Sequence, residues 1–259
     1  MGILRPEEEI MAHFFADVSA VREDRICLTG EDVNHMKNVL RMKINEECTV
    51  SDGTGITYKC RIGAFNPGEA ELLILSKEQN SHELKAKITL YQGLPKSDKL
   101  ESIIQKSVEL GAYRIVPVEM KRCIVRWDEK KGAARQKRYQ AIAESAAKQS
   151  KRDIIPEVGQ TLRLKEAIKE ASQNADVILV PYENADGMDY TRNIIKSIGT
   201  EDRIAVFIGP EGGFETSEIE DLKDAGAKVI TLGKRILRTE TAGPAIIGIL
   251  MFHLESAEY

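Results

Sequence analysis

Strand-like and helix-like segments alternate along the second part of the chain. The strand-like runs are residues 86–93, 114–120, 176–183, 203–210 and 228–233, and the helical patterns between them are residues 99–111, 133–150, 164–173 and 215–226. This alternation predicts an α/β domain in which a mostly parallel sheet carries helices on both faces. Ligands of such domains bind at the carboxyl ends of the strands. The loops that follow Pro181, Gly209 and Gly233 are therefore candidate sites.

The first part of the chain has a different pattern of predicted secondary structure. Short strand-like segments occur at residues 13–18, 25–29, 47–53, 56–65 and 70–77, and one helical pattern interrupts them at residues 31–40. Asp52-Gly53 between two alternating runs is a strong hairpin signal. These features predict a small β-barrel or curled sheet. The polar stretch 78–85 is the expected linker, so we expect domains at 11–77 and 84–259, with residues 1–10 as an extension.

The composition is typical of a soluble globular protein, because 42% of the 259 residues are apolar and 30% are charged. The four cysteines, Cys27, Cys48, Cys60 and Cys123, form no C-x-x-C pair, so neither a zinc site nor a disulfide framework is expected. No apolar signal segment opens the chain, and the longest apolar stretch, residues 243–252, is too short to span a bilayer. We therefore expect a cytoplasmic protein with buried thiols, no membrane segment and no metal.

The net charge of −4 conceals a basic block at residues 121–152, which carries 11 basic and 3 acidic side chains between acidic flanks. Such a block is either a solvated helix face or a surface that binds a polyanion. Both interpretations stay open at this point.

The loop at residues 209–213 is rich in glycine and joins a strand to a helix, an arrangement that often binds phosphate. Its surroundings are acidic, however, with Glu211, Glu215, Glu218 and Glu220 close together. None of the three candidate loops contains a G-x-G-x-x-G or a G-x-x-x-x-G-K-[ST] fingerprint. A phosphate or dinucleotide site is therefore not indicated, which argues against an oxidoreductase.

A purely structural explanation covers part of these loops. Gly212 and Gly213 allow a sharp turn with positive φ, and Ser217 with Glu220 fits a capping box. Gly243-Pro244 can open the last helix. Pro210-Glu211 and the run at residues 235–241 remain unexplained, because no structural need requires this combination of arginines, threonines and a glutamate.

Two of these segments together carry a specific resemblance. "IGPEGGF" at residues 208–214, followed by "LGKRILRTETA" at residues 232–242, resembles the paired C-terminal signatures of the SPOUT methyltransferases. Within them the chain is similar to the bacterial family that methylates N3 of a uridine in 16S ribosomal RNA. Further similar segments are residues 35–41, 99–118 and 143–158. The chain departs from the family pattern at His13 and Asn34, which lie in the small domain.

The resemblance implies S-adenosylmethionine as the cofactor, a trefoil-knotted sheet, and a PUA-like RNA-binding module at the N-terminus. Bare backbone groups suit adenine, glycines allow close approach, and acidic side chains are compatible with a sulfonium cation. The cofactor-binding residues that the resemblance implies are Tyr182, Glu183, Gly209, Pro210, Glu211, Gly213, Leu232, Gly233, Ile236 and Leu237.

Methylation of uridine N3 requires loss of a weakly acidic proton and stabilisation of the charge that spreads to the ring oxygens. We expect Arg238 to stabilise this charge. Glu240 or Glu211 is the candidate base, although positioning alone could supply much of the rate. The candidate catalytic residues are therefore Arg238 and Glu240, with an ion pair that fixes the loop as the alternative role.

The expected partner is ribosomal RNA or the small ribosomal subunit. The RNA-binding candidates are His35, Arg41, Arg122, Arg126, Arg135, Lys137, Arg138 and Arg152. The alternative to RNA contact for His35 is a structural role as a partly buried helix residue. Other RNA targets, such as a ribose 2′-oxygen or a transfer RNA base, and a non-catalytic ribosome-assembly role remain alternatives.

The last apolar segment, residues 243–254, is apolar on nearly every side. A helix of this kind must be buried all round, and little chain remains to cover its second face. A homodimer through this helix is therefore expected, and the resemblance implies the same. The alternative is that the helix lies inside a large single-chain core.

Overall fold

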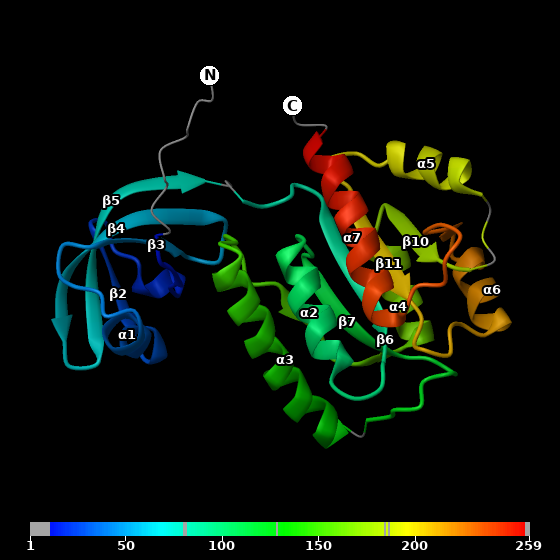
Figure 1. Cartoon of the computed structure of the whole chain (residues 1–259), viewed down its shortest axis with the longest axis horizontal. Helices are drawn as coiled ribbons and strands as arrows, with labels where there is room; N and C mark the ends of the chain where they lie inside the picture. Colours follow the sequence, from blue (N-terminus) through cyan, green and yellow to red (C-terminus); the bar gives the residue numbers. More distant parts are fainter. Residues whose placement is uncertain (1–10, 80–81, 128, 184, 186, 257–259) are drawn as a thin grey trace. The chain divides into compact units, whose positions relative to one another are not determined.

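The computed structural model describes residues 11–256 apart from 80, 81, 128, 184 and 186 (Figure 1). The chain forms two compact units. Unit 1 contains the described residues up to Glu83 together with Ala147–Ile155, and unit 2 contains Leu84–Ala146 and the residues from Pro156 onward. The domain limits at 11–77 and 84–259 remain a prediction, to which the structure adds that Ala147–Ile155 lies with unit 1.

Unit 1 is a curled five-stranded sheet with the order β1-β3-β4-β5-β2. Its strands are β1 (His13–Phe15), β2 (Arg25–Thr29), β3 (Glu47–Ser51), β4 (Ile56–Asn66) and β5 (Glu69–Gln79). The antiparallel pair β3–β4 turns at Asp52-Gly53, where Gly53 has φ of 77°, as the hairpin signal predicts. One helical turn, α1 (Glu31–Asn34), continues as a π-helical turn at His35–Val39.

One face of this sheet forms the core of unit 1. Phe14, Ile26, Val50, Ile62 and Leu72 are almost fully buried, and Ile26, Ile62 and Leu72 alternate with more exposed residues along their strands. Cys48 and Cys60 lie opposite each other on β3 and β4 within this core. All four cysteines are free thiols, and all but the partly exposed Cys27 are buried.

Unit 2 contains a parallel sheet with the order β12-β10-β11-β6-β7-β8, and β9 pairs with β7. The strands are β6 (Lys87–Gly93), β7 (Arg114–Glu119), β8 (Glu157–Val158), β9 (Leu162–Arg163), β10 (Val177–Pro181), β11 (Arg203–Ile208) and β12 (Lys228–Ile230). Every pairing among them is parallel, which confirms the predicted sheet. The carboxyl ends of β10, β11 and β12 therefore meet at one edge.

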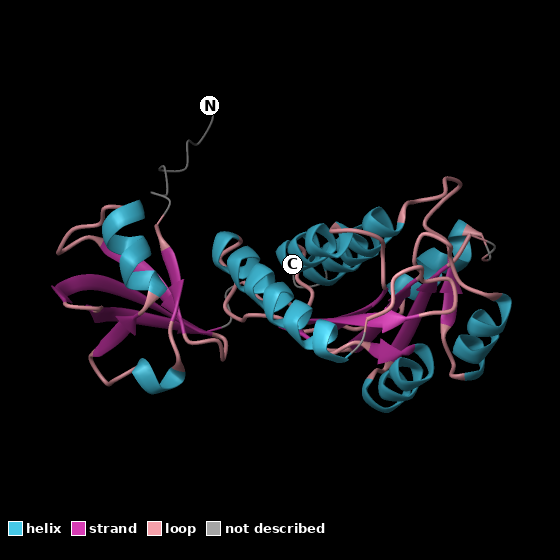
Figure 2. Cartoon of the chain, turned by 90° about the horizontal axis from the view of Figure 1, so that it is seen from below, coloured by secondary structure: helices cyan, strands magenta, loops and turns pink. Residues whose placement is uncertain are grey.

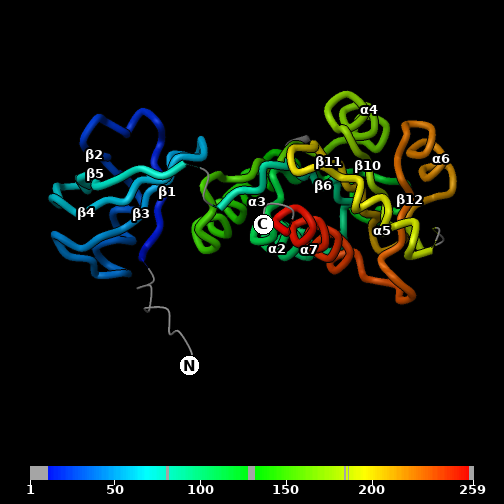
Figure 3. Tube along the Cα trace, turned by 90° about the horizontal axis from the view of Figure 1, so that it is seen from above, coloured from blue at the N-terminus to red at the C-terminus, as the bar shows by residue number. Residues whose placement is uncertain are grey.

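Helices cover both faces of this sheet (Figure 2). The helix bounds are α2 (Lys99–Glu109), α3 (Glu129–Gln149), α4 (Leu164–Asn174), α5 (Met188–Lys196), α6 (Thr216–Asp224) and α7 (Thr239–Ser256). Helices α2 and α7 pack together on one face, and α4 and α6 lie on the other (Figure 3). No helix among the described residues has the length and apolar character that crossing a membrane requires.

Two helix starts differ from the predictions. Helix α6 begins at Thr216, and its capping box joins Glu215 and Glu218 instead of Ser217 and Glu220. The Glu215 amide donates to the Glu218 carboxylate at 2.8 Å. A glutamate thus takes the N-terminal cap, because its carboxylate reaches the free amides of the first turn.

Helix α7 begins at Thr239, one turn before Gly243-Pro244, so Pro244 lies inside the helix. Pro244 is the sixth helical residue, so its missing amide leaves the carbonyl of Glu240 without its regular intrahelical hydrogen bond. The amides of Thr241 and Ala242 bond to the carbonyl of Arg238, which places Arg238 at the exact entry to the helix.

Candidate active site

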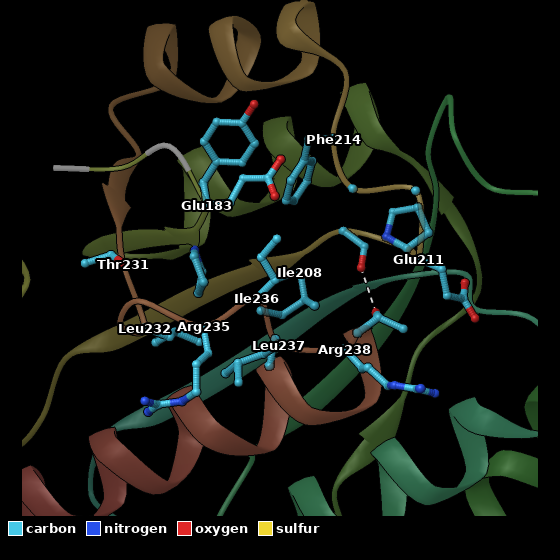
Figure 4. A pocket seen from close by; sticks show the side chains of 18 of the residues that line it. Glu183, Ile208, Glu211, Phe214, Thr231, Leu232, Arg235, Ile236, Leu237 and Arg238 are labelled. Carbon is cyan, nitrogen blue, oxygen red and sulfur yellow. Dashed lines mark hydrogen bonds between the residues drawn. The ribbon is translucent and has the colours of Figure 1, made fainter. Parts of the chain in front are cut away.

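The three candidate loops meet at the carboxyl edge of the parallel sheet and enclose a pocket of about 420 Å³ (Figure 4). One loop follows β10, the second is the glycine-rich segment after β11, and the third joins β12 to α7. In Figure 4 the side chains of Glu211 and Arg238 lie on one side of the pocket, and Leu232 and Arg235 lie on the other.

All ten residues predicted to bind a cofactor line this pocket, and so does Arg238. Glu240 does not line it but contacts a lining residue, Lys99. Sequence reasoning missed several lining residues: Lys99, Ile208, Gly212, Phe214, Thr231, Arg235, Thr239 and Ala242. Most of them lie in the same three loops, so their position next to predicted residues in the sequence was a usable signal. Lys99 comes from a distant segment, and although residues 99–118 resemble the family, nothing in the sequence indicated that Lys99 contacts this pocket.

Close backbone packing explains the glycines of the loop after β11. Gly213 has φ of 69°, and its amide donates to the Pro210 carbonyl at 2.9 Å. A Cβ on Gly209 would lie 3.1 Å from the backbone of Gly213. A Cβ on Gly93, at the end of neighbouring β6, would lie 2.7 Å from Pro210. A side chain at position 93 would collide with Pro210 and one at position 209 would crowd the loop backbone, whereas Gly213 is favoured by its positive φ.

The acidic residues at the start of α6 are bound by the chain itself. Arg122 donates to Glu215 at 2.8 Å and to the carbonyl of Gly212 at 2.9 Å. The amide of Lys121 donates to Glu218 at 2.8 Å. The segment after β7 therefore fastens the glycine-rich loop from outside, and these carboxylates are not oriented towards a ligand.

A buried hydrogen-bond chain links the other side of the loop to α7. The hydroxyl of Thr239 donates to the Gly209 carbonyl at 2.7 Å and accepts from the amide nitrogen of Gln92 at 2.8 Å. Gln92 is completely buried. The first residue of α7 is thereby fixed to the pocket floor, which orients its neighbours Arg238 and Glu240.

Charged side chains gather at one end of the pocket. The ammonium of Lys99 lies 3.1 Å from Glu211 and 3.2 Å from Glu240. Glu211 also accepts from the amide of Lys96 at 3.1 Å. Arg238 is different, because its side chain is 81% exposed and its Nη1 lies 4.0 Å from Oε1 of Glu240.

These contacts shift the titration of the two carboxylates. Burial alone would raise the pKa of Glu211, but hydrogen bonds from backbone amides and from Lys99 hold it below its usual range. A hydrogen bond from its own backbone amide, together with Lys99, lowers the pKa of Glu240. Hydrogen bonds to Glu211 and Glu240 raise the pKa of Lys99. All three groups are therefore charged near neutral pH.

Comparisons with known proteins identify the family. The model of an RNA methyltransferase domain matches residues 82–251, and that of an RNA methyltransferase PUA domain matches residues 28–75. The chain is 32% identical over 231 residues to the ribosomal RNA small subunit methyltransferase E of Bacillus subtilis, covering 88% of this chain and 90% of that protein. The enzyme of the same name from Mesomycoplasma hyopneumoniae is 33% identical over 235 residues, covering 90% and 95%. The chain belongs to this RNA methyltransferase family.

A solved member of the family supports the fold assignment. The crystal structure of ribosomal RNA small subunit methyltransferase E from Neisseria gonorrhoeae, bound to S-adenosyl methionine, matches with a TM-score of 0.81 at 32% identity. The match covers 93% of this chain and 97% of that one. The SPOUT-type parallel sheet and the PUA-like N-terminal sheet predicted from sequence are thereby confirmed.

The predicted RNA-binding residues of this family member fall into different environments. In unit 1, His35 and Arg41 are exposed, so the alternative of a partly buried His35 is wrong. In unit 2, Arg126 pairs with Glu119 at 3.4 Å and Arg138 with Glu101 at 2.7 Å. Arg135 lies over the ring of Trp127, and Lys137 is exposed. Arg122 holds the glycine-rich loop, as described above.

The prediction that Arg152 belongs to an RNA-binding surface is wrong. Its side chain is only 4% exposed, and its guanidinium binds both carboxylate oxygens of Glu83, with Nε at 3.1 Å. The amides of Asp153 and Ile154 bond to the same carboxylate. Arg152 is thus an internal residue of unit 1, where its guanidinium is not available to RNA. A count of basic residues in the sequence cannot distinguish such a buried pair from surface charge.

Proposed function

We propose that this protein transfers a methyl group from S-adenosylmethionine to N3 of a uridine in 16S ribosomal RNA of the small ribosomal subunit. One observation carries the proposal: residues from three separate loops, each assigned to the cofactor from the family pattern, line a single pocket. Membership of the RNA methyltransferase family supports the reaction class.

The pocket suits the cofactor in size and chemistry. Its volume of about 420 Å³ falls within the usual range for small-molecule sites. Gly209, Gly213 and Gly233 expose backbone groups that can pair with adenine, and Ile236 and Leu237 offer apolar contact. Glu183 adds a carboxylate to the lining that is compatible with a sulfonium cation, whereas Glu211 is already paired with Lys99.

S-adenosylmethionine, when bound, supplies an electrophilic methyl group. The chain must position uridine N3 against this group and stabilise the negative charge that develops on the ring oxygens. The exposed guanidinium of Arg238, at the pocket wall, is suited to that second task. Glu211 and Glu240 are poor general bases near neutral pH, because their pKa values lie below their usual range. We therefore propose that the N3 proton leaves to solvent.

RNA recognition is proposed for both parts of the chain. The PUA-like domain, at 11–77, would contribute His35 and Arg41, and its family model supports an RNA-binding role. The methyltransferase domain, at 84–259, would contribute Arg122, Arg126, Arg135, Lys137 and Arg138. We place the enzyme in the cytoplasm, where its ribosomal substrate would be met.

A homodimer through α7 completes the proposal. Ile249 and Phe252 are 45% and 74% exposed on the outer side of this apolar helix. A second subunit would cover these side chains and bring another chain close to the pocket. Ile247 and Leu250, by contrast, are fully buried within the chain and belong to its own core.

A calorimetric titration tests the cofactor assignment. The purified protein should bind S-adenosylmethionine with a defined stoichiometry and should show no heat of binding with NAD. Binding of NAD but not of S-adenosylmethionine would support a dinucleotide enzyme and contradict the proposal. Retained RNA binding without binding of either cofactor would instead favour a non-catalytic assembly protein.

A further inference from the structure

Lys99 joins three segments that are far apart in the sequence. It is the first residue of α2, whereas Glu211 lies in the glycine-rich loop and Glu240 in the first turn of α7. Its ammonium is within 3.2 Å of both carboxylates. The three side chains are 32%, 27% and 23% exposed, so solvent screens their charges only in part.

Helix α2 gives Lys99 a rigid base. Leu100, Ile103 and Ile104 are completely buried, and the helix packs against α7 on the same face of the sheet. A residue on such an element holds its partners more reproducibly than a loop residue can. Lys99 therefore adds a contact from a rigid helix to the loop that carries Glu211.

Glu240 has two cationic neighbours, one near each carboxylate oxygen, and only Lys99 is in close contact. Its Oε2 is 3.2 Å from Lys99, whereas its Oε1 remains 4.0 Å from Nη1 of Arg238, beyond hydrogen-bond distance. Without the ammonium, Glu240 would lose its close partner and could pair directly with Arg238. A guanidinium neutralised in that way would stabilise less negative charge on a substrate.

We propose that Lys99 is a positioning residue of the methyl-transfer site, which ties Glu211 to Glu240 and keeps Glu240 from forming a close ion pair with Arg238. The inference rests on the proposed function. It assigns Lys99 no contact with the substrate, because Lys99 acts through the two carboxylates.

Four variants test this role by steady-state methylation of ribosomal RNA. Lys99→Met should lower kcat by about 10- to 100-fold, with a smaller change in KM for S-adenosylmethionine. The reason is that Glu240 then pairs with Arg238 and neutralises its guanidinium. Lys99→Arg should retain most of the activity. Lys106→Met, the same change at an exposed position of α2, serves as the matched control and should behave as wild type.

The decisive variant is the double change Lys99→Met with Glu240→Gln. Removal of the carboxylate releases Arg238, so the double variant should be at least several-fold more active than Lys99→Met alone. A residue that merely supported the fold would give no such recovery. A double variant no more active than Lys99→Met, or a Lys99→Met enzyme as active as Lys106→Met, would overturn the proposal.

A measurement without substrate separates this inference from the proposed function. Carbon-13 NMR of the glutamate carboxyl groups should show Glu211 titrating below the usual glutamate range in the wild type and at higher pH in Lys99→Met, because Lys99 is its one cationic side-chain partner among the described residues, whereas Glu240 should stay low in the variant because it then pairs with Arg238. Ordinary titration of Glu211 in the wild type refutes the tie between Lys99 and Glu211 even if Lys99→Met folds poorly, and an unchanged Glu211 titration in a folded Lys99→Met protein refutes it as well. Absence of methylation by the wild type would refute the proposed function, while this titration would still decide the role of Lys99.

Discussion

At the scale of single residues, two glycines allow a controlled test of the cofactor loop. Gly213 and Gly226 have φ of 69° and 86°, and no atom lies within 4 Å of a Cβ built on either. Valine at either position should therefore cost a similar backbone strain of about 1–2 kcal/mol. Only Gly213 lines the pocket. Gly213→Val should abolish calorimetric binding of S-adenosylmethionine, whereas Gly226→Val should leave it unchanged; equal affinities in two folded variants would remove this loop from the site.

His13 predicts how acid affects stability. Its Nε2 must donate to the carbonyl of Arg152 at 3.1 Å, and its Nδ1 lies 2.9 Å from the hydroxyl of Thr49. Burial lowers the pKa of His13 from 6.5, although the hydrogen bond to Arg152 opposes this shift. The unfolded chain therefore binds this proton more readily, and the free energy of unfolding should fall as the pH decreases below about 6.5.

Urea unfolding at a series of pH values checks this prediction. His13→Asn should flatten the dependence of unfolding free energy on pH in that window. His35→Asn, at an exposed histidine of the same unit, is the control and should preserve the wild-type dependence. An unchanged pH dependence in His13→Asn would show that other groups dominate.

At the scale of elements, the outer side of α7 is the feature that the dimer hypothesis must explain. Lysine at both Ile249 and Phe252 should yield folded monomers, because these side chains are exposed within one chain. Ile124→Lys changes another exposed apolar residue, 71% accessible in the loop after β7, and should not affect assembly. Light scattering distinguishes the 28.9 kDa monomer from a dimer. A monomeric wild type at micromolar concentration would contradict the hypothesis.

The exposed side of α3 provides a separate test of RNA binding. Reversal of Arg135, Lys137 and Arg138 to Glu should weaken binding to ribosomal RNA and flatten its dependence on salt by about 0.7–0.9 per lost phosphate contact. Lys165 and Lys169, exposed on α4, provide a control for charge reversal. The same salt slope in both variants would show that the side chains of α3 are only a solvated surface.

The elements also show what the sequence could and could not reveal. Apolar runs identified β10 and β11, and because parallel strands end at one edge, the loops after β10, β11 and β12 could be assigned to a single site. Helix α5 was missed because a polar, glycine-containing segment precedes it, and β8 and β9 have only two residues each. Lys99 could not be found, since its contacts arise only when α2 packs beside α7. Arg152 looked like surface charge until its pairing with Glu83 was seen.

At the scale of the whole molecule, each unit has its own sheet and its own core, and a separate family model matches each of them. This division suits an enzyme in which one domain carries out the chemistry and the other adds RNA contacts to those of the first. Full activity should therefore require the intact chain, even though every residue of the cofactor pocket belongs to unit 2.

The most direct test of the central claim is to map the methyl group transferred by the purified protein. Small ribosomal subunits and naked 16S ribosomal RNA from a strain lacking the enzyme would be incubated with S-adenosylmethionine, with Gly213→Val as the inactive control. We predict one methylated uridine that stops reverse transcriptase, because a methyl group on N3 blocks the base-pairing edge, and mass mapping should locate the methyl group on that base. A methyl group on a ribose 2′-oxygen, which protects against alkaline cleavage, or methylation of transfer RNA alone would contradict the account.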